Sequence, residues 1–305
     1  MSPRGGPRLL QGAPVAAEIR AGVREAVVAY GKRHGDPPTL AIVLVGRDAP
    51  SAVYLQQILR SCRNVGVQGR LVEVSGRVSN AGLHDVIAEL NADARVNGII
   101  VQMPLPKHLE LATVLDAIDP GKDIDGIHPM NAGLLALGYD GFLPATARAS
   151  VELLVRSGIE LSGKRAVVLG RSNVVGKPAA LLLLRENATV TIAHSRTADL
   201  RSVLREADVL VVAVGRPGLV TGAMLKRGAV VVDVGINVVD GALVGDVDFA
   251  SASLRASAIT PVPGGVGPVT NAILLTQLMS AAQEQAAAAH ARGHRRRHVP
   301  LRSIH

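Results

Sequence analysis

Apolar residues recur along this chain in two patterns, short continuous runs and longer segments with helical spacing. In the first third, the runs "LAIVLVG" (40–46) and "GIIVQMPLP" (98–106) predict buried strands, and two prolines end the second strand. A third strand is predicted near "RLVEVS" (70–75). Helices are predicted at 15–33, 49–66, 83–96 and 110–118. This alternation makes a βαβαβ unit and therefore predicts a parallel sheet covered by helices on both faces.

A second alternating series begins near residue 165. The predicted strands lie within 165–170, 188–194, 208–215 and 229–239, and a last one runs from 258 into a Gly/Pro-rich loop. Helices are predicted at 173–187 and 197–207, and a closing helix at 271–289. Aromatic residues make up only 2% of the chain and Trp is absent, so Val, Leu, Ile and Ala are expected to build the core. The predicted fold is therefore α/β, with parallel strands under helices rather than a β-sandwich.

Length and charge limit the organisation and the partners. A chain of 305 residues exceeds the size of most single cores, which predicts two domains. The net charge of +8 arises largely from Arg4, Arg8 and five arginines within 290–305, a segment without acids. The body is close to neutral and has no basic stripe with interleaved aromatics, so nucleic-acid binding is not expected. The segment 290–305 is predicted to be a basic, disordered tail, and its irregularly spaced histidines among arginines do not predict a metal site.

Cys62 is the only cysteine of the chain, which excludes an internal disulfide framework. A single thiol is typical of the reducing cytoplasm. The N-terminus has no apolar stretch of signal-peptide length, and no apolar run approaches the length of a membrane span. We therefore expect a cytoplasmic protein that does not bind membranes.

The segment "VVLGRSNVVGKP" (167–178) combines a strand, a glycine turn and the start of a helix. Gly170 permits a tight turn at the end of the strand, and Gly176 lets the helix pack close to the sheet. The free N–H groups of such a helix N-terminus can bind a pyrophosphate. The usual G-x-G-x-x-G pattern is reduced to G-x5-G, so a plain strand–helix turn remains an alternative at this point.

The residues after the next strand indicate which cofactor would fit. An NAD site usually carries Asp or Glu there, which accepts from the ribose 2′-hydroxyl. This chain instead has "HSRT" (194–197), which includes Ser195 and Arg196, and Arg171 lies in the first loop. Hydroxyl donors and positive charge favour the 2′-phosphate of NADP, which an acid would repel. The sequence therefore predicts NADP rather than NAD.

Six blocks, taken in order, resemble the bifunctional methylenetetrahydrofolate dehydrogenase/methenyltetrahydrofolate cyclohydrolase family. They are "VQMPLP" (101–106), "KDIDGIHPMNAG" (122–133), "GRSNVVGKP" (170–178), "ATVTIAHSRT" (188–197), "GDVD" (245–248) and "TPVPGGVGPVT" (260–270). One of these blocks (122–133) lies in the Gly/Pro/Asp-rich loop 119–133. By composition alone, this loop is either a connector between lobes or an active-site loop. Six blocks in the right order make chance agreement negligible, and the resemblance extends over about residues 10–285.

The resemblance implies an N-terminal parallel-sheet lobe that binds folate and a Rossmann-type lobe that binds NADP, with a C-terminal helix returning to the first lobe. In this chain the folate lobe is expected at 1–146 with the returning helix 271–289, and the NADP lobe at 147–270. Members of the family oxidise 5,10-methylenetetrahydrofolate with NADP and then hydrolyse the methenyl product to 10-formyltetrahydrofolate. The resemblance also implies a homodimer through the NADP lobe, with tetrahydrofolate derivatives as substrates.

The resemblance further implies roles for single residues. Tyr54 would stack on the folate, Gln102 would form a hydrogen bond at the reacting centre, and Asp125 would bind the amino edge of the pterin. The positions expected to contact the cofactor are Gly170, Arg171, Ser172, Ser195, Arg196 and Ile236. The loop expected to close over the substrate contains Pro263, Gly264 and Gly265.

The chain departs from the family at one catalytic position. The family pattern is a tyrosine followed four residues later by a lysine, the proposed general acid/base, whereas here Tyr54 is followed by Ile58. Arg60 points to another side of the helix and keeps its proton near neutral pH, and Gln57 and Ser61 do not titrate usefully. A second departure replaces residues that are commonly Cys, Pro and Gly by Ala145, Ala147 and Ala149.

The missing lysine is expected to affect the two half-reactions unequally. Hydride transfer needs mainly alignment of the methylene carbon with the nicotinamide. Opening the methenyl bridge needs an activated water and a protonated nitrogen, to which a positioned acid/base contributes roughly 10²–10⁴-fold. We therefore predict an NADP-dependent dehydrogenase with weak or lost cyclohydrolase activity. The alternatives are a fully bifunctional enzyme, a non-catalytic folate- or NADP-binding paralogue, and an unrelated two-domain dehydrogenase.

Overall fold

The computed structural model of the protein describes residues 6–46 and 49–297, without the side chains of 49–54 and 292–297. The chain divides into two compact units. Unit 1 contains Met1–Ala21 and Asp125–Leu274, and unit 2 contains Gly22–Ile124 and Leu275–His305. The two units are defined by residues that lie close together in space. The predicted domains are defined by the ligand that each lobe is expected to bind, folate or NADP. The bounds of the predicted domains therefore stay a prediction.

Unit 2 contains a three-stranded parallel sheet in the order β3-β2-β4. Its strands are β2 (Thr39–Val45), β3 (Gln68–Val74) and β4 (Gly98–Val101). The register pairs Ile42 of the central strand with Leu71 and Ile100. Every residue of β2 is buried, as a central parallel strand with both faces covered requires. The parallel βαβαβ unit predicted from the apolar runs is thereby confirmed.

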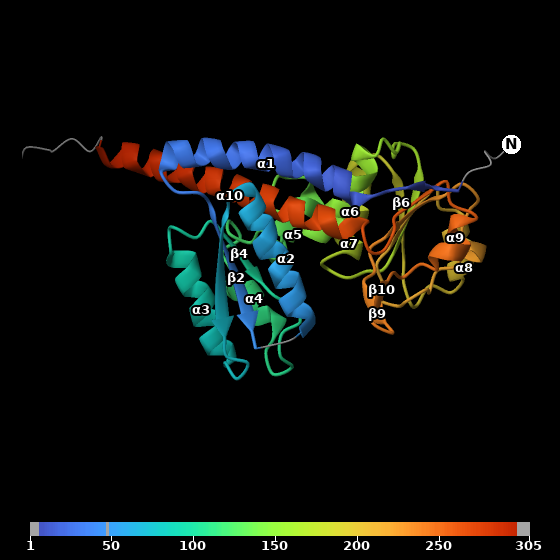
Figure 1. Cartoon of the computed structure of the whole chain (residues 1–305), viewed down its shortest axis with the longest axis horizontal. Helices are drawn as coiled ribbons and strands as arrows, with labels where there is room; N and C mark the ends of the chain where they lie inside the picture. Colours follow the sequence, from blue (N-terminus) through green and yellow to red (C-terminus); the bar gives the residue numbers. More distant parts are fainter. Residues whose placement is uncertain (1–5, 47–48, 298–305) are drawn as a thin grey trace, which may run out of the picture. The chain divides into compact units, whose positions relative to one another are not determined.

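Unit 2 contains the helices α2 (Ala49–Val65), α3 (Asn80–Ala92) and α4 (Leu111–Ala117), whereas α1 (Gly12–His34) and α10 (Val266–Arg297) have residues in both units. Figure 1 shows α2, α3 and α4 placed around the strands of unit 2. Leu55, Ile58, Cys62 and Val65 recur every three or four residues in α2, and all four are buried. Position 58 therefore belongs to the apolar face of its helix.

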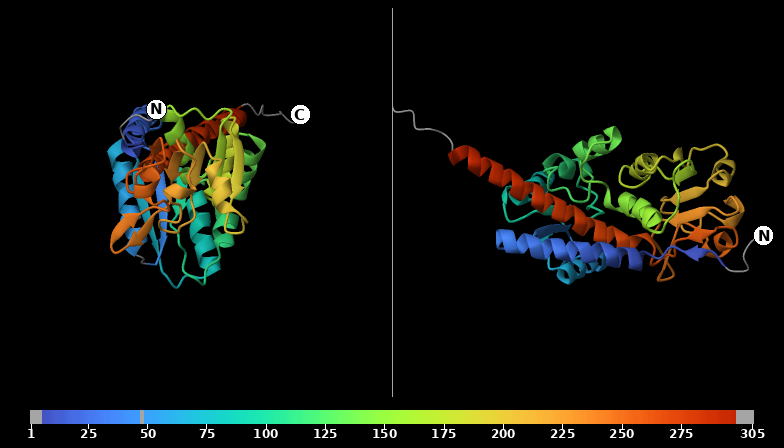
Figure 2. Two further views of the ribbon diagram at one scale, coloured as in Figure 1. Left: turned by 90° about the vertical axis from the view of Figure 1, so that its right-hand side faces the viewer. Right: turned by 90° about the horizontal axis from the view of Figure 1, so that it is seen from above.

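Unit 1 contains a six-stranded parallel sheet in the order β1-β11-β8-β7-β5-β6. Its strands are β1 (Arg8–Leu9), β5 (Arg165–Leu169), β6 (Thr189–Ala193), β7 (Val209–Val212), β8 (Val230–Asp233) and β11 (Ala258–Ile259). Figure 2 shows strands of this sheet side by side in yellow and orange. The chain runs from β5 outward to β6 and then returns to the other side of β5 as β7. This reversal creates a topological switch point between β5 and β7, where Rossmann-type sheets bind their ligand.

The helices of unit 1 cover this sheet and supply its connections. They are α5 (Pro129–Leu137), α6 (Ala145–Arg156), α7 (Gly176–Arg185), α8 (Leu200–Arg205), α9 (Phe249–Ser253) and the 3₁₀ helix Gly222–Met224. The buried cluster of this unit is aliphatic, with Leu169, Leu210 and Val231 among its members. A core of Val, Leu, Ile and Ala was expected from the scarcity of aromatic residues. The predicted α/β class with parallel sheets is confirmed.

Several stretches differ from the sequence prediction, which placed no helix at α6 or α9 and no strand at β1. The predicted strand 229–239 is two strands, because β8 ends at Asp233 and β9 (Asn237–Val239) turns back as β10 (Ala242–Val244). Asp240 and Gly241 form that turn with φ of 49° and 79°, a conformation typical of an Asp-Gly hairpin. The loop predicted at 119–133 contains the start of α5 at Pro129.

The closing helix is longer than predicted, since α10 begins at Val266 and continues to Arg297. The segment 290–297, predicted to be disordered, is therefore helical. The rest of the predicted tail, 298–305, lies outside the described residues. Within the described part of the chain, no helix is both long enough and apolar enough to cross a bilayer.

Candidate active site

The turn after β5 brings two backbone segments into close contact. Gly170 has a φ of +126°, and a Cβ built there would lie 2.2 Å from the carbonyl oxygen of Ala213, the residue that follows β7. A Cβ on Gly176 would lie 2.2 Å from the carbonyl oxygen of Gly170. Only glycine fits at either position. The turn therefore lies directly against the end of β7, at the switch point.

The loop between this turn and α7 is an anion cradle. The Ser172 hydroxyl accepts from the N–H groups of Val175 (3.1 Å) and Gly176 (3.3 Å), which fixes the loop from inside. Residues 171–174 are exposed, and within the described part of the chain their backbone N–H groups have no hydrogen-bond partner. Consecutive free N–H groups before a helix N-terminus form a concavity that favours phosphate. This loop therefore fits the pyrophosphate of a dinucleotide better than the reduced glycine pattern alone indicates.

The segment "HSRT" forms a tight turn beside this cradle. Leu169 and Ala193 pair at the ends of β5 and β6, and the Gly170 N–H donates to the Ala193 carbonyl at 2.9 Å. The backbone N–H of Thr197 donates to the carbonyl of His194 (2.9 Å), and the Arg196 N–H donates to Nδ1 of His194 (3.1 Å). The turn leaves Ser195 and Arg196 exposed. His194, which the sequence analysis did not single out, thus shapes the turn that presents them.

The predicted cofactor residue Ile236 follows β8 and is 65% exposed. Two buried acids that the sequence analysis did not single out hold the backbone around it, Asp233 at the end of β8 and Asp246 after β10. Burial raises the pKa of Asp233 to about 6, against three backbone N–H bonds that favour the charged form. In the sequence, both acids stand next to apolar strands and near glycines, and this pattern is the signal that could have identified them.

The segment containing Pro263, Gly264 and Gly265 follows β11 and precedes α10. The peptide bond before Pro263 is cis, and Gly264 has a φ of +106°. The N–H of Gly12 donates to the Gly264 carbonyl at 2.8 Å, which ties this segment to the first residue of α1. Pro263 and Gly264 are exposed whereas Gly265 is buried. The segment thus exposes two residues, Pro263 and Gly264, while the hydrogen bond to Gly12 and the burial of Gly265 hold it in place.

In unit 2, the predicted catalytic positions are Ile58 on α2 and Gln102 after β4. Both are buried, with 2% and 4% exposure. The backbone N–H of Gln102 donates to the Val43 carbonyl at 2.9 Å. The side chain of Tyr54 lies outside the description, so its predicted stacking role stays a prediction.

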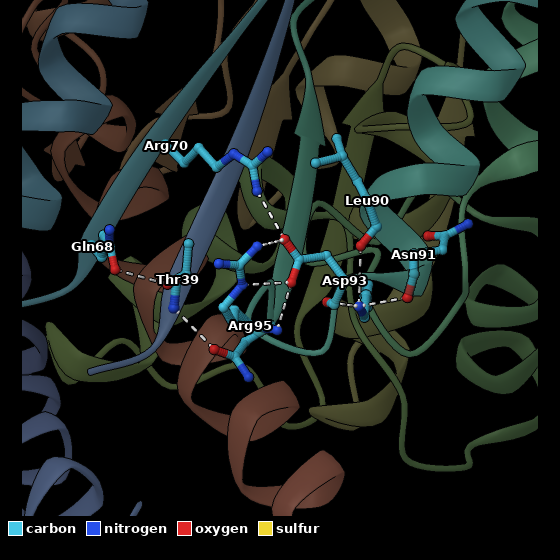
Figure 3. Close-up of polar contacts among 9 residues, drawn as sticks. Thr39, Gln68, Arg70, Leu90, Asn91, Asp93 and Arg95 are labelled. Atoms are coloured by element: carbon cyan, nitrogen blue, oxygen red, sulfur yellow. Dashed lines mark hydrogen bonds and ion pairs between the residues drawn. The ribbon is translucent and has the colours of Figure 1, made fainter. Parts of the chain in front are cut away.

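Lys122 does not replace the missing lysine. Its buried amine donates to the carbonyls of Leu90 (3.2 Å), Asn91 (2.7 Å) and Asp93 (2.9 Å) at the end of α3, which uses its three donors. Figure 3 shows these carbonyls turned toward one point, beside the ion pairs that Arg70 and Arg95 make with Asp93. Burial lowers the pKa of Lys122, opposed by nearby carboxylates.

The predicted pterin residue Asp125 is the first residue of the second segment of unit 1 and is half-buried. Its carbonyl accepts from the N–H of Ala145 at 3.3 Å. Gly126 has a φ of +71°, and a Cβ on it would lie 2.3 Å from the carbonyl carbon of Leu143, so this backbone packs tightly. Among the described residues, no cluster of three His, Cys, Asp or Glu side chains is suited to hold a metal ion.

Comparison with known proteins gives consistent matches along the chain. Residues 10–125 match the family model "Tetrahydrofolate dehydrogenase/cyclohydrolase, catalytic domain", and residues 144–286 match the corresponding "NAD(P)-binding domain". "Bifunctional protein FolD" of Sorangium cellulosum is 50% identical over 282 residues, which cover 92% of this chain and 98% of that protein. The same-named protein of Roseiflexus sp. is 49% identical over 283 residues, with the same coverages.

Solved structures agree with these matches. The bifunctional FolD enzyme of Campylobacter jejuni superposes with a TM-score of 0.88 at 41% identity, covering 91% of this chain and 99% of that chain. The Trypanosoma brucei methylenetetrahydrofolate dehydrogenase-cyclohydrolase, complexed with NADP cofactor and inhibitor, gives a TM-score of 0.88 at 37% identity, covering 92% and 99%. The resemblance drawn from the six sequence blocks is confirmed.

Proposed function

The chain belongs to the tetrahydrofolate dehydrogenase/cyclohydrolase family, and on that premise we propose that it is an NADP-dependent 5,10-methylenetetrahydrofolate dehydrogenase whose cyclohydrolase activity is weak or lost. The observation that carries this proposal is the exposed loop 171–174 before α7 combined with an aliphatic, buried Ile58 at the acid/base position. The product would be 5,10-methenyltetrahydrofolate, a one-carbon carrier.

The cofactor half of the proposal rests on the loops after β5 and β6. The N–H groups of residues 171–174 would bind the pyrophosphate, and Ser172 holds that loop in place. Arg171, Ser195 and Arg196 are exposed and would bind the 2′-phosphate, which selects NADP over NAD. When bound, NADP supplies the hydride acceptor. Ile236 would contact the nicotinamide end of the cofactor.

The folate half of the proposal assigns one role to each group. Asp125 would accept hydrogen bonds from the amino edge of the pterin, and Tyr54 would stack on its ring. Gln102 would form a hydrogen bond at the reacting centre through its side-chain amide. Pro263, Gly264 and Gly265 would cover the substrate. The proposed domains are a folate lobe at 1–146 with 271–289 and an NADP lobe at 147–270.

Loss of the hydrolytic step follows from the chemistry available near position 58. Isoleucine neither donates nor accepts a proton, and Lys122 is held by three carbonyls. The other lysines of unit 2, Lys32 and Lys107, are exposed. Without a positioned acid/base, hydrolysis of the methenyl bridge would slow by about 10²–10⁴-fold. Hydride transfer needs no proton at the reacting carbon and would persist.

A two-part spectrophotometric assay tests this proposal. The enzyme is given 5,10-methylenetetrahydrofolate and NADP, and formation of methenyltetrahydrofolate is followed separately from its disappearance. We expect NADP-dependent formation and a disappearance no faster than without enzyme. Rapid enzymatic disappearance would favour the second candidate, a fully bifunctional enzyme. Relatives that are about 50% identical carry the name "Bifunctional protein FolD". Binding without formation would indicate a non-catalytic paralogue.

Replacing Arg171 with alanine is expected to raise the KM for NADP by about 10- to 100-fold, because a hydrogen bond to a charged group contributes about 1.5–3 kcal/mol. The KM for NAD, which lacks the 2′-phosphate, should change little. Steady-state kinetics with both cofactors measures the difference. Arg201→Ala, which removes another exposed arginine of the same unit, is the matched control. Equal effects of Arg171→Ala on both cofactors would contradict the assignment.

A homodimer through the NADP lobe is supported by the free edge of β6. Among the described residues, this strand pairs only with β5. It contains no charged residue and exposes Thr189, Thr191 and Ile192. The opposite edge strand, β1, has two residues and contains Arg8. Soluble proteins usually protect free edges with charge or short strands, so the unprotected β6 edge suits pairing with a second copy.

Ile192→Lys is therefore expected to convert the dimer to a monomer in light scattering coupled to size exclusion. A charge on the edge strand disfavours its burial in an interface. Leu254→Lys, which changes a residue that is 85% exposed after α9, should leave the dimer intact. A dimer that persists in Ile192→Lys would place the interface elsewhere.

The cytoplasmic location also stays a prediction.

A further inference from the structure

The backbone after β7 wraps around a carboxylate supplied by the chain itself. Asp246 is fully buried, and its Oδ2 accepts from the N–H groups of Val214 (2.7 Å) and Gly215 (2.9 Å). Its Oδ1 accepts from the Arg216 N–H (2.8 Å) and from the Asn237 side-chain amide (2.9 Å). Three consecutive N–H groups that converge on one anion form a backbone nest. The nest after β7 is thus filled from inside.

Asp233 fixes the position of Asp246. Its Oδ1 accepts from the backbone N–H groups of Gly235 (2.9 Å) and Asp246 (3.0 Å), and its Oδ2 accepts from Val247 (2.9 Å). A Cβ on Gly235 would lie 2.2 Å from Cγ of Asp246. A Cβ on Gly245 would lie 1.9 Å from Oδ2 of Asp233. The two carboxylates and the two glycines therefore interlock the segments after β7, β8 and β10.

The interlocked segments adjoin the switch point. Residue 213, whose carbonyl contacts the Gly170 turn, directly precedes the nest of residues 214–216. Ile236 lies between Gly235, bound to Asp233, and Asn237, bound to Asp246. A dinucleotide that places its pyrophosphate on residues 171–174 extends past the ends of β7 and β8. The two carboxylates therefore set the backbone that the nicotinamide half would meet.

Two nests flank this switch point, and they differ in occupancy. Residues 171–174 offer free N–H groups, whereas residues 214–216 donate theirs to Asp246. If Asp246 were absent, the second nest would present three N–H groups to solvent anions or to the cofactor phosphates. Because an internal carboxylate fills the second nest, the pyrophosphate can bind only at residues 171–174. The nicotinamide, which is covalently linked to the pyrophosphate, then has one position along the crevice.

We propose that Asp246, oriented by Asp233, is a positioning residue for hydride transfer, because its carboxylate holds residues 214–216 and 235–237 in the geometry that seats the nicotinamide. This inference rests on the proposed dehydrogenase function. Neither acid touches the reacting atoms in this account. Asp246 acts through the backbone, so its removal alters the alignment of the reactants rather than the chemistry of the step.

The test is Asp246→Asn, which keeps the shape of the side chain but replaces an acceptor oxygen by an NH₂ group. At least one backbone N–H of the nest then faces a donor. We expect kcat for methylenetetrahydrofolate oxidation to fall by about 10²-fold, the typical cost of an ångström-scale misplacement. We also expect a larger isotope effect on kcat with substrate made from dideuteroformaldehyde, because hydride transfer becomes rate-limiting. The matched control is Asp248→Asn, the neighbouring acid, which bonds the Ser251 hydroxyl and should leave both quantities unchanged.

The outcomes separate positioning from mere folding. A purely structural role would lower the amount of active enzyme in Asp246→Asn while leaving the isotope effect at the wild-type value, which would overturn the inference. If Asp246→Asn does not fold, Asn237→Ala removes only one bond to the same carboxylate and should still raise the isotope effect. An unchanged isotope effect in Asn237→Ala would then overturn it. Wild-type enzyme that forms no methenyl product would overturn the proposed function itself.

Discussion

Replacing Ile58 with lysine is expected to raise the rate of methenyltetrahydrofolate hydrolysis by about 10²–10⁴-fold, the contribution of a positioned acid/base. Position 58 lies on the buried face of α2, with 2% exposure. Burial of the new amine, together with a cationic methenyl substrate, would lower its pKa and supply a neutral base near pH 7. The rate is measured as loss of methenyl absorbance, and methenyl formation should change little.

The same substitution is expected to lower stability, because it places a polar amine on an apolar helix face. Burying an amine without full pairing costs several kcal/mol. Ile58→Met, similar in size and without the amine, controls for repacking. Ile58→Arg adds a charge that does not lose its proton near neutral pH. If wild-type protein already hydrolyses the methenyl substrate as fast as Ile58→Lys does, another group carries the proton and the account of α2 is wrong.

The sequence predicts those parts of the fold that repeat a simple pattern. Strand β2 is an unbroken apolar run, and α2 buries a residue every three or four positions, so both elements follow from periodicity. The run 229–239 hides a break because Val234, Gly235 and Ile236 continue the apolar pattern while the backbone leaves the sheet. Periodicity reports which residues are apolar, and here the break depends on Asp233 binding the N–H of Gly235.

The candidate site shows the same division. The exposed positions of Arg171 and Ser195 after strand ends agree with the sequence pattern, whereas their contacts to a phosphate stay predictions. The nest of residues 214–216 could not be predicted, since its donors are backbone N–H groups that the letters "VGR" do not reveal, and its anion comes from Asp246, thirty positions or more along the chain. Backbone donors are invisible in a sequence until the fold places an acceptor against them. The burial of Lys122 beneath the end of α3 is another contact that only the fold reveals.

Asp125→Ala is expected to weaken tetrahydrofolate binding by about 10²–10⁴-fold. A carboxylate that accepts from two N–H groups of the pterin makes two charge-assisted bonds, each contributing about 1.5–3 kcal/mol. Asp125 begins a segment whose backbone packs against 143–145, so the loop keeps its path when the side chain is shortened. NADP binding should therefore stay at the wild-type level. Calorimetric titration with each ligand measures the two affinities separately.

Two further variants sharpen the assignment of Asp125. Asp125→Asn keeps the size of the side chain but loses one acceptor and the charge, so its folate affinity should lie between those of wild type and Asp125→Ala. Asp116→Asn, which alters an exposed acid on α4, should bind both ligands normally. Folate affinity that is unchanged in Asp125→Ala would show that this loop does not hold the pterin. A proton shuttle at this position would instead lower kcat with folate affinity intact, because binding would not depend on the carboxylate.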